Sequence, residues 1–130
     1  MKFREAVFKK GGTLPALEIV VGQDGYDGFT TDPTGATVKF NMVLRSDHAS
    51  YKVTAAAGSI QDISLLNDGT YQATLVYAWI LADRDTVKQY DGEYEVTIGA
   101  DIIHIPTGEV DEDLKEIRKY IPISIVESLS

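Results

Sequence analysis

The stretch Asp91-Gly92-Glu93-Tyr94-Glu95-Val96-Thr97-Ile98 joins a turn dipeptide to a run of alternating polar and apolar residues. An earlier stretch, Asp68-Gly69-Thr70-Tyr71, has the same Asp-Gly-x-Tyr signature and opens a second alternating run that ends at Trp79. Asp-Gly pairs favour tight turns, and a period of two is typical of a strand with one buried face. The two copies therefore predict two β-strands, each preceded by a turn.

Other segments show the same alternation between turn residues. The clearest runs from Ala36 to Leu44, where every second residue is apolar. Pro122 in the last run favours an edge position or the first residues of a strand, because proline cannot donate to the ladder. The remaining predicted strands are Ala16 to Val21, Tyr51 to Ala57, Ile60 to Leu65, Ile102 to Ile105, and the run that contains Ile121, Ile123 and Ile125.

Two segments are predicted to be helical. Leu81 to Gln89 is polar and fits one helical turn. Between Glu109 and Tyr120 the apolar residues fall at helical spacing, which predicts a short amphipathic helix. Its solvated face would carry Asp111, Glu112, Asp113 and Glu116. Short strands with glycine-rich turns predict an all-β fold, an antiparallel β-sandwich with one short helix near the C-terminus, formed by residues 1–130 as a single domain.

The second signature has a specific interpretation in such a sandwich. A tyrosine near the start of a late strand can bond back to the backbone across a tight corner. Gly92 and Tyr94 have the required spacing, so they are the candidate structural corner. The alternative is a plain turn followed by an aromatic core residue.

Composition excludes several classes of protein. The 130 residues contain no cysteine, which rules out disulfides and thiolate chemistry. The net charge of −8 repels phosphate backbones, so we expect no nucleic-acid binding, and its usual role is solubility. The N-terminal residues lead into no apolar run of signal-peptide length, and no segment approaches the about 20 apolar residues of a membrane span. We expect a soluble protein made in the cytoplasm.

Candidate chemical sites are few. His48 and His104 are far apart in the sequence and have no metal-ligand spacing, and a structural role is expected for His104 among isoleucines. Asp24, Asp27 and Asp32 could collect around calcium, but aspartate beside glycine is usual turn chemistry. Nucleophile-elbow, P-loop and dinucleotide motifs are absent from the sequence. We therefore expect no catalytic residues, no metal, no cofactor and no enzymatic activity.

A surface rather than a pocket is the expected binding feature. Val20, Val76 and Ile80 fall on the outward phase of their strands and form the candidate interface. A second apolar face on a sheet marks a partner interface, although single exposed apolar residues are also normal.

Several segments together carry a family resemblance. The run Asp32-Pro33-Thr34-Gly35-Ala36-Thr37-Val38-Lys39-Phe40 resembles the "D-L-T-G-A-T-V-x-F" segment of small immunoglobulin-like domains in phage particles, including the N-terminal domain of phage baseplate upper proteins. The resemblance extends from about Lys10 to Val126. Its other parts are Lys10 to Pro15, Trp79 at a strand end, Asp85-Thr86 followed by Gly92 to Val96, and Ile105-Pro106 with the isoleucine-rich last strand.

This resemblance implies that the predicted fold is an immunoglobulin-like antiparallel β-sandwich. It also implies a non-enzymatic structural or adaptor protein of a bacteriophage virion, located in the tail, the baseplate or the head–tail neck. Its partners would be other virion proteins in a symmetric homo-oligomeric assembly. The alternative is a module that binds host-surface carbohydrate or decorates a capsid. That alternative predicts a site at the loop end of the sandwich with exposed aromatic residues such as Tyr26 and Phe29.

Overall fold

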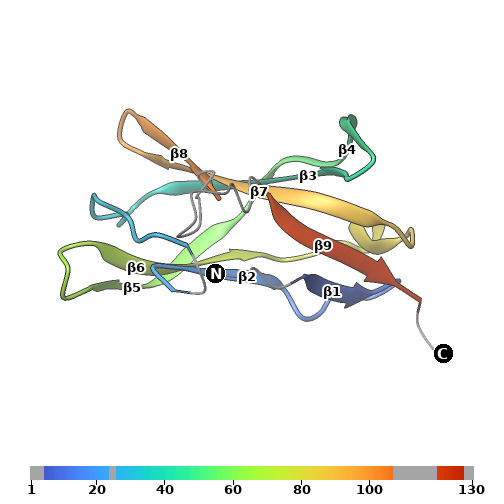
Figure 1. The fold of residues 1–130 in the computed structure, drawn as a ribbon, viewed down its shortest axis with the longest axis horizontal. Coiled ribbons are helices and arrows are strands. Elements are labelled where there is room, and N and C mark those ends of the chain that lie inside the picture. Colours follow the sequence, from blue (N-terminus) through green and yellow to red (C-terminus); the bar gives the residue numbers. More distant parts are fainter. Residues whose placement is uncertain (1–4, 24–25, 107–119, 128–130) are drawn as a thin grey trace, which may run out of the picture.

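A computed structural model describes residues 5–23, 26–106 and 120–127 of the chain. Within these ranges the chain forms nine strands and one short 3₁₀ helix, arranged as two packed sheets (Figure 1). The elements in chain order are β1 (Ala6–Lys9), β2 (Leu17–Val21), β3 (Thr37–Leu44), β4 (Asp47–Ala57), β5 (Ser59–Leu65), β6 (Tyr71–Tyr77), the 3₁₀ helix η1 (Leu81–Arg84), β7 (Gln89–Ile98), β8 (Asp101–Ile105) and β9 (Ile121–Val126). The expected all-β sandwich is confirmed.

The larger sheet has six strands and is organised around β7. Its order is β1-β9-β7-β3-β4, and β8 also pairs with β7. One edge of β7 pairs with β3 from Tyr90 to Thr97, whereas the other edge is shared between β9 in its first half and β8 in its second half. The smaller sheet has the order β2-β6-β5. The strand β7 therefore positions side chains from most of the larger sheet.

One pair of strands departs from the expected antiparallel arrangement. β1 runs parallel to β9, with Ala6 opposite Ile123 and Lys9 opposite Val126. The sequence did not predict β1, because its four residues are too few to show a clear alternation. The pairing of β1 with β9 joins residues that are far apart in the sequence, and local sequence patterns do not reveal such pairings.

The core lies between the two sheets and is rich in aromatic rings. Phe40 on β3 stacks on Tyr77 of β6 with a centroid distance of 4.7 Å, and it lies 5.1 Å from the ring of Tyr94 on β7. Trp79 packs edge-on against Tyr77 at 5.4 Å and against Phe8 of β1 at 5.0 Å. Aromatic pairs of this kind contribute about 0.5–1.5 kcal/mol each beyond their buried area. The rings thus join both sheets.

The chain passes from the larger sheet to the smaller one at Gly58. The backbone N–H of Gly58 donates to the carbonyl of Val38 at 2.9 Å. A Cβ at this position would lie 3.0 Å from Val38 Cγ1 and 3.0 Å from the Val76 carbonyl oxygen. Only glycine fits without displacing these neighbours, so β4 and β5 can follow each other directly while lying in different sheets.

The two Asp-Gly-x-Tyr copies have different structures. Asp68-Gly69 is a turn before β6, as predicted: Gly69 has a φ of 88° and the Thr70 N–H donates to Asp68 Oδ1 at 2.9 Å. Asp91-Gly92 lies inside β7, which begins at Gln89, so the prediction of a turn there is wrong. A Cβ on Gly92 would lie 2.7 Å from Ile123 Cδ1 and 3.0 Å from Phe40 Cε1. Gly92 is required for close packing, not for a turn.

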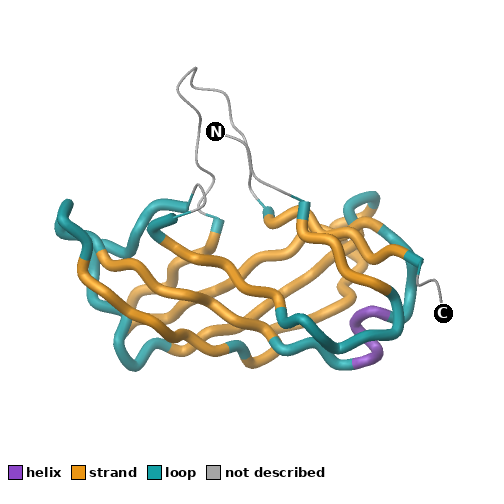
Figure 2. The backbone as a smooth tube through the Cα atoms, turned by 90° about the horizontal axis from the view of Figure 1, so that it is seen from below, coloured by secondary structure: helices purple, strands orange, loops and turns teal. Residues whose placement is uncertain are grey.

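Most of the remaining strand predictions are confirmed within a few residues. Pro122 is the second residue of β9, which agrees with its expected place among the first residues of a strand. The helical turn expected from Leu81 to Gln89 is the shorter η1, which Figure 2 places at one end of the sandwich. The predicted helix from Glu109, with its acidic face, lies outside the described residues. Among the described residues, no helix is long and apolar enough to cross a membrane.

Candidate functional site

The hydroxyl of Tyr94 links the two sheets. It donates a hydrogen bond to the carbonyl oxygen of Leu17 on β2 at 2.8 Å, and both residues are buried. Burial holds the pKa of Tyr94 well above its usual value, so the hydroxyl stays protonated. The bond spans 77 positions and joins opposite sheets. It therefore does not close the local corner that the spacing of Gly92 and Tyr94 predicted.

A polar groove is the principal concave feature that we identify on the outer face of the larger sheet. Its volume is about 450 Å³. The groove lies over β3, β4, β7 and β8, and Tyr120 closes one side of it. Its floor includes the largely buried Val43. The polar and aromatic residues that line it are Lys39, Asn41, His48, Tyr51, Thr54, Asp91, Glu93, Glu95, His104 and Tyr120.

The alternation of β7 explains why three carboxylates line the groove. Successive side chains of a strand point to opposite faces. Tyr90, Tyr94 and Val96 are buried in the core, so the residues between them face outward. Asp91, Glu93 and Glu95 are therefore spaced two residues apart along the groove.

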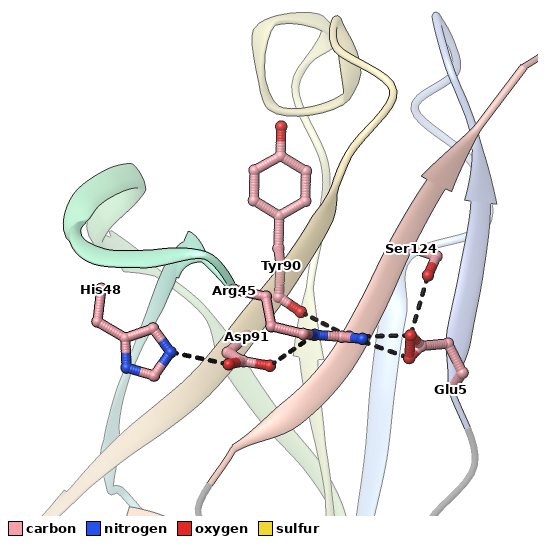
Figure 3. A network of polar contacts seen from close by, with 6 residues as sticks. All are labelled: Glu5, Arg45, His48, Tyr90, Asp91 and Ser124. Carbon is pink, nitrogen blue, oxygen red and sulfur yellow. Dashed lines mark hydrogen bonds and ion pairs between the residues drawn. The ribbon is translucent and has the colours of Figure 1, made fainter.

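A network of ion pairs crosses the sheet beside the groove (Figure 3). Arg45 Nη2 donates to both carboxylate oxygens of Glu5, at 2.9 and 3.1 Å, and Arg45 Nε donates to Asp91 Oδ1 at 3.2 Å. The other oxygen of Asp91 lies 2.8 Å from His48 Nε2. Ser124 Oγ on β9 donates to Glu5 Oε1 at 2.9 Å. The network orients Asp91 and His48 at the groove. It links the strands β4, β7 and β9 to the β3–β4 turn and to the residue before β1.

Both histidines line this groove. His104 Nδ1 lies 3.1 Å from Glu93 Oε1, and the His104 side chain is 53% exposed, so this histidine has a polar partner and does not pack among the isoleucines. Ile103 and Ile105, its neighbours in the sequence, point to the opposite face of β8. His48 packs edge-on against Tyr120 with a centroid distance of 4.8 Å. Their separation in sequence conceals this proximity, because strand order brings β4, β7 and β8 together.

Two charged residues of η1 are buried, which sequence analysis did not predict. Asp83 accepts a hydrogen bond from the Tyr77 hydroxyl at 2.6 Å and from the Ile80 N–H at 3.1 Å. Arg84 is 2% exposed and donates to the carbonyls of Lys9 and Leu14. Burial lowers the pKa of Arg84. These bonds hold the β1–β2 connection against the end of the sandwich and leave neither group free for chemistry.

The loop aromatic residues predicted for a carbohydrate site are not exposed. Tyr26 and Phe29 retain only 7% and 3% of their accessible surface, so that prediction is wrong. Phe29 exchanges two backbone hydrogen bonds with Tyr71, which draws the loop onto β6. Gly28 permits this close approach, because a Cβ there would lie 2.6 Å from Thr70 Oγ1.

Asp32 in the same loop follows the expected turn chemistry. Asp32 Oδ1 accepts hydrogen bonds from the N–H and the hydroxyl of Thr34, at 3.0 and 2.6 Å. These bonds lower the pKa of Asp32. Asp24 lies outside the described residues. In the described parts of the chain, we find no group of three or more histidine, aspartate and glutamate side chains arranged to hold a metal ion.

The candidate interface residues lie in two places. Val20 and Val76 are half-buried on the outer face of the smaller sheet, on adjacent strands and diagonal to each other in register. Ile80 lies after the end of β6 and is 61% exposed. The three residues therefore do not form one continuous strip of a single sheet.

Comparisons with known proteins add no relative. The chain matches no family model, no curated protein and no solved structure at a significant level. The fold and the groove define an all-β sandwich with a polar, aromatic-lined face.

Proposed function

We propose that this chain is a non-enzymatic adaptor of a bacteriophage particle that docks onto neighbouring virion subunits at the tail, the baseplate or the head–tail neck. It would be made in the host cytoplasm and then join a symmetric assembly of virion proteins. Two lines of support are independent of each other. One is the resemblance carried by Asp32 to Phe40 and the segments around it, and the other is the strand order.

The strand order is the observation that carries the proposal. Immunoglobulin sandwiches place their second, fifth and fourth strands in one sheet and their third, sixth and seventh strands in the other. The order β2-β6-β5 corresponds to the first of these sheets. In the larger sheet, β4, β3 and β7 follow in the variable-type order, and β8 with β9 occupies the place of the last strand. This agreement supports an immunoglobulin-like class, which the resemblance also implies.

The docking surface that we propose is the outer face of the smaller sheet. Val20 and Val76 are apolar residues on that face, and they are surrounded by the polar side chains of Glu18, Gln72 and Thr74. A small apolar centre with a polar rim is the usual anatomy of a protein interface. Ile80 lies apart from this surface, directly before η1.

Binding to particles that lack the chain tests this proposal. Particles made with its gene deleted are mixed with the purified protein, and cosedimentation is measured. We expect saturable binding for the natural chain and a loss of at least about tenfold for Val76→Lys, because a buried unpaired charge costs more than 1.4 kcal/mol.

The matched control is Ile102→Lys, which adds the same charge at a residue that is 58% exposed on the larger sheet. This variant should bind like the natural chain. Absence of any binding by the natural chain would refute the adaptor function. Equal binding by both lysine variants would refute only the docking surface.

A further inference from the structure

The groove on the larger sheet has the dimensions and lining of a ligand site. Small-molecule sites range from about 300 to 1,000 Å³, and this groove has a volume of about 450 Å³. Tyr51 is 59% exposed and lines it, and Tyr120 provides a second aromatic wall. An exposed tyrosine ring offers an apolar face together with a hydroxyl at its rim.

Several polar groups in the groove have unused hydrogen-bonding capacity. Glu95 and Lys39 are direct neighbours across β7 and β3, yet neither side chain has a hydrogen-bond or ion-pair partner among the residues that the structure describes. The Oδ1 atom of Asn41 accepts from the Ala55 N–H at 2.7 Å, which fixes the amide and leaves its NH₂ group as a donor. The groove thus presents donors and acceptors side by side.

The charges in and around the groove disfavour strongly ionic ligands. Asp91 shares the guanidinium group of Arg45 with Glu5, and Glu93 is hydrogen-bonded to His104. An anionic ligand would meet the remaining carboxylate of Glu95, and a cationic ligand would meet the ammonium group of Lys39. A neutral ligand whose groups both donate and accept hydrogen bonds matches this mixture best.

From this combination we propose that the groove binds a neutral oligosaccharide. Each sugar hydroxyl can donate to Glu95 and accept from Lys39 or from the NH₂ group of Asn41. The C–H face of a sugar ring would pack on Tyr51. The site lies on the opposite outer face from Val20 and Val76, so a docked subunit and a bound sugar would not compete.

A glycan array that carries neutral, sialylated and uronic-acid oligosaccharides provides the first test. The natural chain should bind neutral oligosaccharides, and the strongest neutral binder is then titrated into ¹⁵N-labelled protein. We expect saturable chemical-shift changes for β3, β4 and β7, including the side-chain NH₂ signals of Asn41. A trilysine peptide is titrated in the same way as a cationic probe. The proposal would be overturned if the protein bound no neutral glycan, bound only acidic glycans, or bound the trilysine peptide in place of sugars.

Two variants locate the site. Glu95→Gln and Tyr51→Ala should each weaken binding about tenfold, which corresponds to the loss of a charge-assisted hydrogen bond or a packed ring. The matched controls are Glu18→Gln and Leu65→Ala, both exposed on the smaller sheet, and these should bind as the natural chain does. If the groove variants and the controls bind equally well, the sugar site lies elsewhere and the proposal fails. Cosedimentation with particles tests the adaptor function separately.

Discussion

Removing the hydroxyl of Tyr94 tests how the two sheets are held together. Tyr94→Phe keeps the ring and its packing against Phe40 but deletes the donor that reaches Leu17. The Leu17 carbonyl is then left in the core without this bond, since the site is too buried for water to replace it. The change isolates one hydrogen bond between β7 and β2.

The expected loss follows from the removal of one partner of a buried hydrogen bond. Such a removal costs about 1–3 kcal/mol, and full burial of Tyr94 and near-full burial of Leu17 favour the middle of that range. We expect the free energy of unfolding to fall by about 2 kcal/mol. For a domain of this size, that loss lowers the melting temperature by about 6–10 °C.

The assay is thermal and urea unfolding of the variant beside a matched control. Tyr71→Phe makes the same change in the other copy of the signature, where the hydroxyl is half-buried and has no partner among the described residues. We expect the control to melt within about 2 °C of the natural chain, as surface changes do. Equal melting temperatures for Tyr94→Phe and the natural chain would refute the bond between the sheets.

Three further predictions concern packing, the buried arginine and alkaline pH. Gly92→Ala should lower the free energy of unfolding by about 1–3 kcal/mol through overpacking, whereas Gly69→Ala should lower it by about 1 kcal/mol because of the positive φ at Gly69. Urea unfolding of Gly92→Asn and Gly69→Asn separates these two causes. Asparagine should be tolerated at position 69, where φ is positive, but not at position 92, where there is no space. Arg84→Lys should lower the free energy of unfolding by about 2–3 kcal/mol, since an ammonium group cannot reach the carbonyls of Lys9 and Leu14 together; an unchanged urea midpoint would contradict this. Burial raises the pKa of Tyr94 above its unfolded value, so its ionisation should leave stability unchanged between pH 8 and about 10 and lower it at higher pH. Melting curves from pH 8 to 11 should show a smaller fall for Tyr94→Phe.

The sequence predicted the sheets better than their connections. The alternation from Ala36 to Leu44 places Val38, Phe40 and Met42 in the core, and all three are buried. That alternation has one cause, the burial of one strand face, so it can be read locally. The parallel pairing of β1 with β9 has no local cause, because it depends on which strand is left without a partner at the sheet edge.

The duplicated signature shows where local chemistry is insufficient. Gly69 and Gly92 follow aspartate in the same way, yet only Gly69 has a positive φ. Gly92 is dictated by Ile123 and Phe40, which approach it from neighbouring strands. The sequence gives no indication of those neighbours until the strand order is known.

The groove could not be predicted for a related reason. Its residues come from positions 39 to 120, and they meet only because β4, β3, β7 and β8 lie side by side. The Asp-Gly pair at 91 and 92 predicted a turn, so the sequence did not show that the carboxylates at 91, 93 and 95 share one outward face of a strand. The loop residues Tyr26 and Phe29 suggested exposure because they lie among glycines, but both are buried, and a bridge joins Phe29 to Tyr71.

The proposed adaptor function is tested most directly by quantitative mass spectrometry of purified phage particles, taken from the phage that the proposal requires to encode this chain. A virion adaptor in a symmetric assembly should be present after density-gradient purification at a fixed copy number, in a ratio of small whole numbers to other tail, baseplate or neck proteins. Particles that are complete and infectious but contain none of the chain would contradict the proposed function.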